Sequence, residues 1–218
     1  MSIATLILGE SGTGKTCSLR NLDPGDVLLV QPLRKPLPFR GKGWREGKGG
    51  TTFVCEDAAT IAQIMKKCPR PIIVIDDWQY LLANQFMARR KETGFQKFTD
   101  IGGAGFDIMK AATELDETKR VYVLAHTATD DMGNIRIKTL GKLLDDKVVI
   151  EGMFTTVLRT YVENGKYYFS TQNSGQDTVK SPVGLFESNL IDNDLKFVDD
   201  RICEYYEIPN HLKKENNE

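Results

Sequence analysis

The stretch "LILGESGTGKTCS", residues 6–18, holds a glycine-rich turn with the pattern G-x-x-x-x-G-K-T between Gly9 and Thr16. The mostly apolar residues Ile3–Leu8 precede this turn and are typical of a buried strand. Residues Lys15–Leu22 follow it without an internal proline or glycine, which favours a helix. A strand, this turn and a helix in this order predict a phosphate-binding loop.

The residue types of this loop suit a phosphate ligand. Successive backbone N–H groups form a concave anion site, and Gly12 and Gly14 let the backbone approach a phosphate without a Cβ. We expect Lys15 to reach the β- and γ-phosphates of a nucleotide and the Thr16 hydroxyl to bind Mg²⁺. The alternative is a glycine-rich turn that binds nothing. The predicted nucleotide contacts are Gly9, Glu10, Ser11, Gly12, Thr13, Gly14, Lys15, Thr16 and Cys17.

The overall composition bounds the class of protein. A chain of 218 residues predicts one domain, residues 1–208, with a polar tail at 209–218. A net charge of −1 means that any nucleic-acid site is local. The four cysteines lack C-x-x-C spacing and predict reduced thiols, and two histidines exclude a His-rich metal site. No apolar run is long enough to span a bilayer, so we expect a cytoplasmic protein without a membrane segment.

The order of elements predicts an α/β fold with a mostly parallel sheet covered by helices. Two later apolar runs, Val157–Val162 and Tyr167–Thr171, flank an Asn-Gly turn and predict an antiparallel hairpin. The expected parallel strands are Ile3–Leu8, Val27–Gln31, Thr52–Cys55, Ile72–Ile75 and Val121–Ala125. The expected helices are Lys15–Leu22, Ala58–Lys67, Gln79–Arg90 and Gly105–Leu115.

Two carboxylates end the apolar run "PIIVIDD", residues 71–77. A buried strand would bring Asp76 to the carboxyl edge of the sheet, where it can assist a Mg²⁺ ion beside the phosphate loop. The adjacent Asp77 could orient or deprotonate an attacking water. Either residue could instead cap the following helix. Glu10 and Glu56 are rival candidates for the catalytic base.

The run "RVYVLAHT", residues 120–127, predicts another buried strand that ends at a polar residue, His126. At the same edge, His126 could hydrogen-bond the γ-phosphate or its water and so report the nucleotide state. The alternative is a loop histidine without a role. The chain has no N/T-K-x-D motif for reading guanine and no evident arginine-rich lid, so ATP is favoured over GTP and hydrolysis over transfer to a metabolite.

The chain resembles the RecA-core P-loop ATPases, and in particular the small phage-encoded members of the single-strand annealing and recombination group. The phosphate loop, the "VIDD" strand, the "VLAHT" strand and the late hairpin follow the order of that core. The stretches "KTLGKLLDDKVVIEGMF", "YYFSTQNSGQDTVKSPVGLFE" and "LIDNDLKFVDD" carry the specific likeness. The resemblance implies an ATP- and Mg²⁺-dependent ATPase that binds single-stranded DNA, assembles into oligomers or filaments and works with a phage annealing or single-strand-binding protein in the host cytoplasm.

Two positions bear on how far the resemblance extends. RecA carries a catalytic glutamate at the end of the strand after the first helix, whereas this strand ends at Gln31. Hydrolysis would then be slow or use Asp77 or Glu56. RecA also carries paired lysines shortly before a proline, which reach the ATP of the neighbouring subunit. One lysine, Lys180, precedes Pro182 here. The resemblance implies that it acts in trans, and the alternative is an exposed lysine at a loop edge.

Basic residues with interleaved aromatics suggest where single-stranded DNA would bind. They cluster in residues 34–50 and 86–98, and the resemblance adds the loops near 91–105 and 128–147. The alternative is a set of solvated flexible loops. The predicted DNA contacts are Arg40, Lys42, Trp44, Arg45, Arg89, Arg90, Arg136 and Lys138.

Three functions therefore remain open from the sequence. The first is a RecA-like ATPase that binds single-stranded DNA in phage recombination. The second is a nucleotide-switched assembly or loader protein that contacts other proteins and not DNA. The third is a nucleotide or metabolite kinase.

Overall fold

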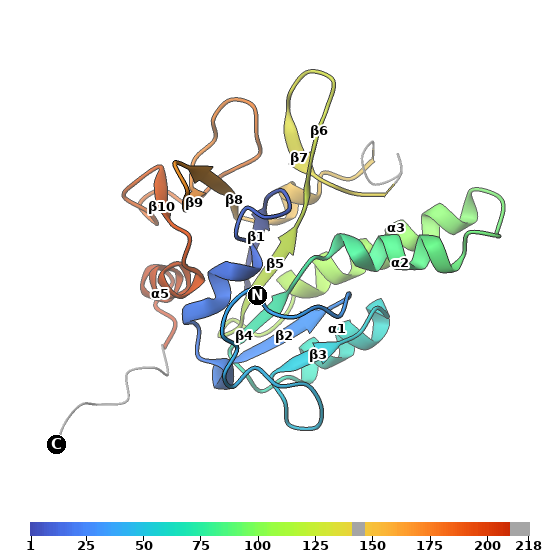
Figure 1. Cartoon of the computed structure of the whole chain (residues 1–218), viewed down its shortest axis with the longest axis horizontal. Helices are drawn as coiled ribbons and strands as arrows, with labels where there is room; N and C mark the ends of the chain where they lie inside the picture. Colours follow the sequence, from blue (N-terminus) through green and yellow to red (C-terminus); the bar gives the residue numbers. More distant parts are fainter. Residues whose placement is uncertain (141–146, 210–218) are drawn as a thin grey trace.

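The computed structural model describes residues 1–140 and 147–209, and it shows one large sheet with helices on both faces (Figure 1). The sheet has eight strands in the order β10-β9-β8-β1-β5-β4-β2-β3, and β6 and β7 form a separate hairpin. The strands are β1 (Ile3–Leu8), β2 (Val27–Gln31), β3 (Thr52–Val54), β4 (Ile72–Ile75), β5 (Arg120–Ala125), β6 (Thr127–Thr129), β7 (Ile135–Ile137), β8 (Thr156–Glu163), β9 (Lys166–Ser170) and β10 (Leu190–Asp192). The α-helices are α1 (Ala58–Lys67), α2 (Gln79–Ala88), α3 (Gln96–Thr113) and α5 (Leu195–Tyr205), and the 3₁₀ helices are η1 (Thr16–Asn21), η2 (Pro24–Asp26) and η3 (Ile150–Met153).

Six neighbouring strands of the sheet are parallel. β1 pairs with β5 on one side and β8 on the other, β4 pairs with β5 and β2, and β2 pairs with β3. The carboxyl ends of β1, β5 and β4 therefore meet at one edge of the sheet, with β5 between the other two. In open α/β sheets, this edge is where ligands bind.

The C-terminal hairpin forms as expected. β8 and β9 pair antiparallel, and Asn164 and Gly165 adopt positive φ angles of 51° and 75° at the turn. This geometry is the one that an Asn-Gly pair favours. The predicted fold class, α/β with a mostly parallel sheet, covering helices and a C-terminal antiparallel hairpin, is confirmed.

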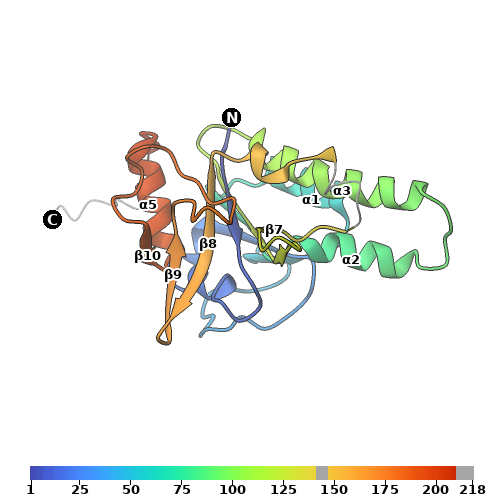
Figure 2. The same cartoon turned by 90° about the horizontal axis from the view of Figure 1, so that it is seen from above.

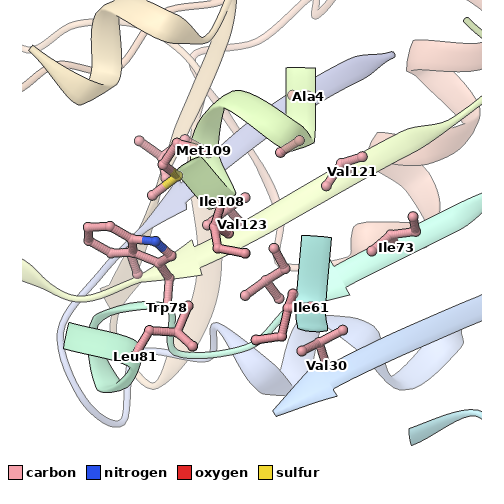
Figure 3. Close-up of a cluster of buried hydrophobic side chains, with 14 of the residues drawn as sticks. Ala4, Val30, Ile61, Ile73, Trp78, Leu81, Ile108, Met109, Val121 and Val123 are labelled. Carbon is pink, nitrogen blue, oxygen red and sulfur yellow. The ribbon is translucent and has the colours of Figure 1, made fainter. Parts of the chain in front are cut away.

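Helices α1, α2 and α3 cover one face of the sheet, and α2 and α3 lie side by side (Figures 1 and 2). Figure 3 shows Ile61 of α1 and Ile108 of α3 packed with Val123 of β5 in this core. Trp78, which precedes α2, is fully buried and donates its indole N–H to the carbonyl of Gly105. The face is held mainly by apolar contacts.

The other face carries η1 and α5, with Leu19, Val198 and Ile202 in its core. A buried polar network joins this face to the sheet. Arg120 of β5 donates two hydrogen bonds of 2.9 Å to the carboxylate of Asp199 on α5. The network therefore joins β5, a strand that the sequence predicts, to α5, a helix that it does not predict.

Several predicted boundaries differ from the structure. The helix expected at Lys15–Leu22 is the short 3₁₀ helix η1. The Ser18 hydroxyl donates a hydrogen bond to the Lys15 carbonyl, which in an α-helix would accept a backbone N–H. β3 ends one residue early, β5 begins one residue early, and α2 ends at Ala88. The β6–β7 hairpin and α5 were not expected. Of the predicted tail at 209–218, residues 210–218 lie outside the described part of the chain.

Helix α3 begins at Gln96, nine residues before the predicted start at Gly105. A Cβ on Gly105 would lie 2.6 Å from a methyl carbon of Leu82 and 3.0 Å from a ring carbon of Trp78. This glycine therefore lets α3 approach α2 closely, which offsets its low helix propensity.

Within the described ranges, no helix combines the length and the apolar character that crossing a bilayer requires.

Candidate functional site

The glycine-rich turn after β1 has the backbone that a phosphate-binding loop requires. Gly12 and Gly14 adopt φ angles of 80° and 98°, which side chains disfavour. A Cβ on Gly9 would lie 1.8 Å from the hydroxyl of Thr160 on β8, so only glycine fits there. The same hydroxyl lies 2.6 Å from that of Thr13, and this contact holds the turn against the sheet.

Lys15 lies folded back into the loop. Its side chain is 5% exposed, and Nζ donates hydrogen bonds of 2.9 Å to the carbonyls of Gly9 and Glu10. Burial lowers the pKa of Lys15 against the opposing charges of Asp77 and Asp76. The ammonium is thus a largely desolvated positive charge within the concave turn, where it can attract an anionic ligand.

Thr16 and Asp76 meet across the sheet edge. The Thr16 hydroxyl donates a hydrogen bond of 2.8 Å to Oδ1 of Asp76, which follows β4. Asp76 is 1% exposed, and its Oδ2 finds no hydrogen-bond partner among the described residues. Burial, with the neighbouring charge of Asp77, raises the pKa of Asp76. The Gln31 amide lies close enough to oppose that shift, without forming a hydrogen bond of normal geometry.

This pair fits a Mg²⁺ ion beside a bound nucleotide. Mg²⁺ prefers oxygen ligands and usually takes one or two from protein, with phosphates and water supplying the others. A threonine hydroxyl and a buried carboxylate oxygen that accepts no hydrogen bond among the described residues match that ligand set. No cluster of three or more His, Cys, Asp or Glu that could hold a metal occurs in residues 1–140 and 147–209.

Asp77 is held in an unusual backbone conformation, with a φ of 63°. Its Oδ2 accepts a short hydrogen bond from Lys35, and its Oδ1 lies 3.3 Å from Nε2 of His126. Burial raises the pKa of Asp77, but the hydrogen bonds from His126 and Lys35 and the charges of Lys35 and Lys15 outweigh it and lower the pKa to about 2. Such a carboxylate is a weak proton acceptor, which argues against Asp77 as a general base.

A single pocket of about 420 Å³ joins these groups. It brings together the loop, Asp77 beyond the end of β4 and His126 after β5, as the sequence predicts, while the buried Asp76 is not among its lining residues. Its lining consists of Ser11, Gly12, Gly14, Lys15, Thr16, Cys17, Lys35, Pro36, Pro38, Asp77, His126 and Tyr167.

The remaining catalytic candidates lie elsewhere. Glu56 follows edge strand β3 and accepts a hydrogen bond of 2.9 Å from Asn84, and it is not among the pocket residues. The Glu10 side chain is exposed, and this residue contributes its carbonyl to Lys15. Lys180 is exposed beside Val157 of β8, with which it exchanges two backbone hydrogen bonds, and it does not reach the pocket of its own chain. A trans role for Lys180 stays a prediction.

The structure separates the predicted DNA contacts into two groups. Arg40, Lys42 and Arg45 are exposed on the segment after β2. Trp44 is partly buried, packs against the core that includes Leu19, and lies edge-on to the Phe39 ring with 6.1 Å between the ring centroids, so part of its surface is already covered. A DNA contact at this position stays a prediction.

The second group is also mixed. Arg89 is engaged by Glu92 and Asp100, so its charge is already offset, and Arg90 is exposed after α2. Arg136 and Lys138 are exposed on and after β7. Lys142, in the same loop, lies outside the described residues.

The sequence did not single out Lys35 and Tyr167 as pocket residues. Lys35 was one of several basic residues in a loop, and the only available signal was its place four residues after a strand tip. Tyr167 is the second residue of β9, far along the chain from the phosphate loop. Both reach the pocket only through the order of strands in the sheet.

We predict opposite effects on stability when the two adjacent carboxylates are neutralised. Because burial disfavours ionised Asp76, Asp76→Asn should stabilise the protein at pH 7 without Mg²⁺, by about 1 kcal/mol, and the gain should shrink as the pH falls and the wild-type carboxyl protonates. The matched control is Asp77→Asn, which also tolerates a positive φ. This change should destabilise, because the folded state favours ionised Asp77. Urea unfolding of both variants at pH 7 and pH 4 measures the change in the free energy of unfolding. A change of the same sign in both variants at pH 7 would contradict the prediction.

These features define the class: an α/β protein with a phosphate-binding P-loop, a threonine–aspartate pair and a charged pocket at the carboxyl edge of a mostly parallel sheet. No protein-family model matches the chain, and no curated protein matches it. Among solved structures, the chain is similar to the crystal structure of the KaiC-like protein PH0186 from the hyperthermophilic archaeon Pyrococcus horikoshii OT3. The two share 13% identity over 77% of each chain, with a TM-score of 0.42.

Proposed function

We propose that this protein is a Mg²⁺-dependent ATPase with a RecA-like core that binds single-stranded DNA. The observation that carries the nucleotide part is the hydrogen bond from Thr16 to Asp76 at the mouth of the P-loop. A buried ionised carboxylate is costly unless a cation or a set of donors uses it. Here one oxygen is used by Thr16, and the other faces Lys35 at 3.7 Å.

The phosphate loop and the polar residues beyond β4 and β5 have separate roles in this proposal. The loop N–H groups and Lys15 bind the β- and γ-phosphates, and Thr16 with Asp76 holds the Mg²⁺ ion. The ion would offset negative charge on the phosphates. His126 and Asp77 orient the attacking water by hydrogen bonds. The low pKa of Asp77 makes it a weak general base, so we expect slow hydrolysis in the absence of a partner or DNA.

The DNA part of the proposal is supported by the resemblance and by the exposed cations Arg40, Lys42 and Arg45. These belong to the segment that runs from Lys35 in the pocket, so a strand bound there would lie close to the nucleotide site. Oligomers, trans action of Lys180, and a phage annealing or single-strand-binding partner belong to the same proposal. A loader protein that contacts no DNA is the competing function.

One experiment tests the two parts together. Phosphate release from Mg·ATP is measured without an added acceptor, with and without an oligo-dT strand. We expect slow release that the strand accelerates. Turnover of ATP only with a metabolite acceptor would indicate a kinase. If the oligo-dT strand neither binds nor changes the rate of phosphate release, the loader function is favoured.

Reversing the three loop charges should weaken strand binding. The variant with Arg40, Lys42 and Arg45 changed to glutamate should bind oligo-dT more weakly and flatten the salt dependence by about one unit per lost phosphate contact. The control changes three exposed lysines on α1 and α3 to glutamate: Lys66, Lys67 and Lys110. Equal losses in both variants would show a general charge effect and exclude this loop as the contact.

A further inference from the structure

Lys35 occupies a position in the pocket that the P-loop pattern does not explain. It comes from the segment after β2, yet its Nζ forms a short hydrogen bond with Asp77 Oδ2 and lies 3.7 Å from Asp76 Oδ2. Pro36 and Pro38 line the pocket beside it, and their fixed φ angles restrict the path of the segment. Lys35 is therefore directed at both carboxylates, while the basic residues that follow it are exposed.

The charges of the pocket balance only because Lys35 is there. Lys15 and Lys35 supply two positive charges, and Asp76 and Asp77 supply two negative ones. Lys35 forms ion pairs with both carboxylates, with its Nζ 3.7 Å from Asp76 Oδ2 and in a short contact with Asp77 Oδ2. Without a nucleotide, the Lys35 ammonium offsets the carboxylate that a Mg²⁺ ion would otherwise offset.

Lys35 and a cation beside Thr16 cannot both use Asp76 Oδ2 at close range, because like charges at such a separation repel. When a metal–nucleotide complex enters, Lys35 has to leave Asp76. The terminal phosphate of a triphosphate is the anion that would then lie within the same pocket. A diphosphate lacks that group.

We propose that Lys35 is the residue that distinguishes a nucleoside triphosphate from a diphosphate in this site. It rests on the carboxylate pair in the empty state, stays on Asp77 alone in the diphosphate state and moves to the γ-phosphate in the triphosphate state. The movement carries the start of the basic segment 36–50 with it. This inference rests on the proposed nucleotide-binding function and adds to it a cis-acting phosphate contact linked to the proposed DNA-binding loop.

Binding affinities test the proposal without any turnover. A fluorescent non-hydrolysable triphosphate and the matching diphosphate are titrated in Mg²⁺ into wild type, Lys35→Met, Lys35→Arg and the control Lys48→Met. Lys48 lies on the same segment and is exposed. Lys35→Met should lose about tenfold or more of triphosphate affinity, as expected for a charge-assisted hydrogen bond. Its diphosphate affinity should stay unchanged or rise, and Lys35→Arg should keep most of the wild-type ratio.

Hydrogen exchange of the segment 34–50 provides the second readout. The wild-type protein should show different protection with the two nucleotides, and Lys35→Met should show the same protection with both. An unchanged affinity ratio in a Lys35→Met protein that is folded by thermal unfolding would overturn the Lys35 proposal and leave the proposed function standing. Failure of the wild-type protein to bind either nucleotide would overturn both.

Discussion

The Lys15→Met variant should lose triphosphate binding by about 100-fold or more and keep its fold. The Lys15 ammonium lies in the concave turn, held by the carbonyls of Gly9 and Glu10. A bound phosphate offers it charged acceptors instead, and hydrogen bonds to charged groups contribute about 1.5–3 kcal/mol each. Loss of contacts to two phosphates therefore gives roughly this change in affinity.

The fold should survive because the folded state gains little from this charge. Burial lowers the pKa of Lys15, which means that desolvation opposes the ammonium. Methionine is of similar length and keeps the apolar contacts of the stem. Calorimetric titration with Mg·ATP measures binding, and thermal unfolding measures stability. The control is Lys67→Met, an exposed lysine in the last turn of α1. Equal affinity in the Lys15 variant and the control would exclude the P-loop assignment.

The Asp199→Ala variant should lower the free energy of unfolding by about 3–5 kcal/mol, the cost of leaving a buried charge without its partner. Both carboxylate oxygens of Asp199 accept hydrogen bonds from Arg120, and Oδ1 also accepts one of 2.6 Å from the Tyr122 hydroxyl. Arg120 and Tyr122 are 2% and 0% exposed, so water cannot replace the lost acceptor.

The adjacent residue offers a matched control for this prediction. Asp200 pairs with Lys196 on the partly exposed surface of α5, where such pairs contribute about 0–1 kcal/mol. Urea unfolding of Asp199→Ala and Asp200→Ala compares the two sites. The double variant Arg120→Met with Asp199→Leu should recover most of the loss, because it removes both charges together. Similar losses in Asp199→Ala and Asp200→Ala would show that the buried network does not hold α5 to the sheet.

The local patterns of the chain account for most of the sheet and for part of the site. The runs of β1, β2 and β4 are short and mostly apolar, and each ends at a glycine, a proline or a pair of aspartates. Neighbours along the chain supply this signal by themselves. The Asn-Gly turn of the β8–β9 hairpin is equally local. The helix predicted from Gly105 begins nine residues too late, and the close packing of this glycine against Trp78 and Leu82 is a tertiary contact that local patterns do not report.

Other features depended on partners that are distant in the sequence. Trp44 reads as a base-stacking residue among basic neighbours, but it packs on a core contributed mainly by other segments. Asp77 reads as a candidate base, but its partners Lys35 and His126 lower its pKa and make it a weak proton acceptor. A side chain's neighbours along the chain do not report its burial or its ion pairs.

The sequence by itself determined the phosphate loop, the strand that delivers Asp76 and the strand that delivers His126. Each rests on residue types and spacing within one short stretch, since backbone geometry and hydrophobic periodicity act over a few residues. Only the tertiary structure decided that Lys35 and Tyr167 enter the same pocket and that Glu56 stays out of it. These outcomes depend on the order of the strands across the sheet, which long-range packing sets and which no local pattern in the chain encodes.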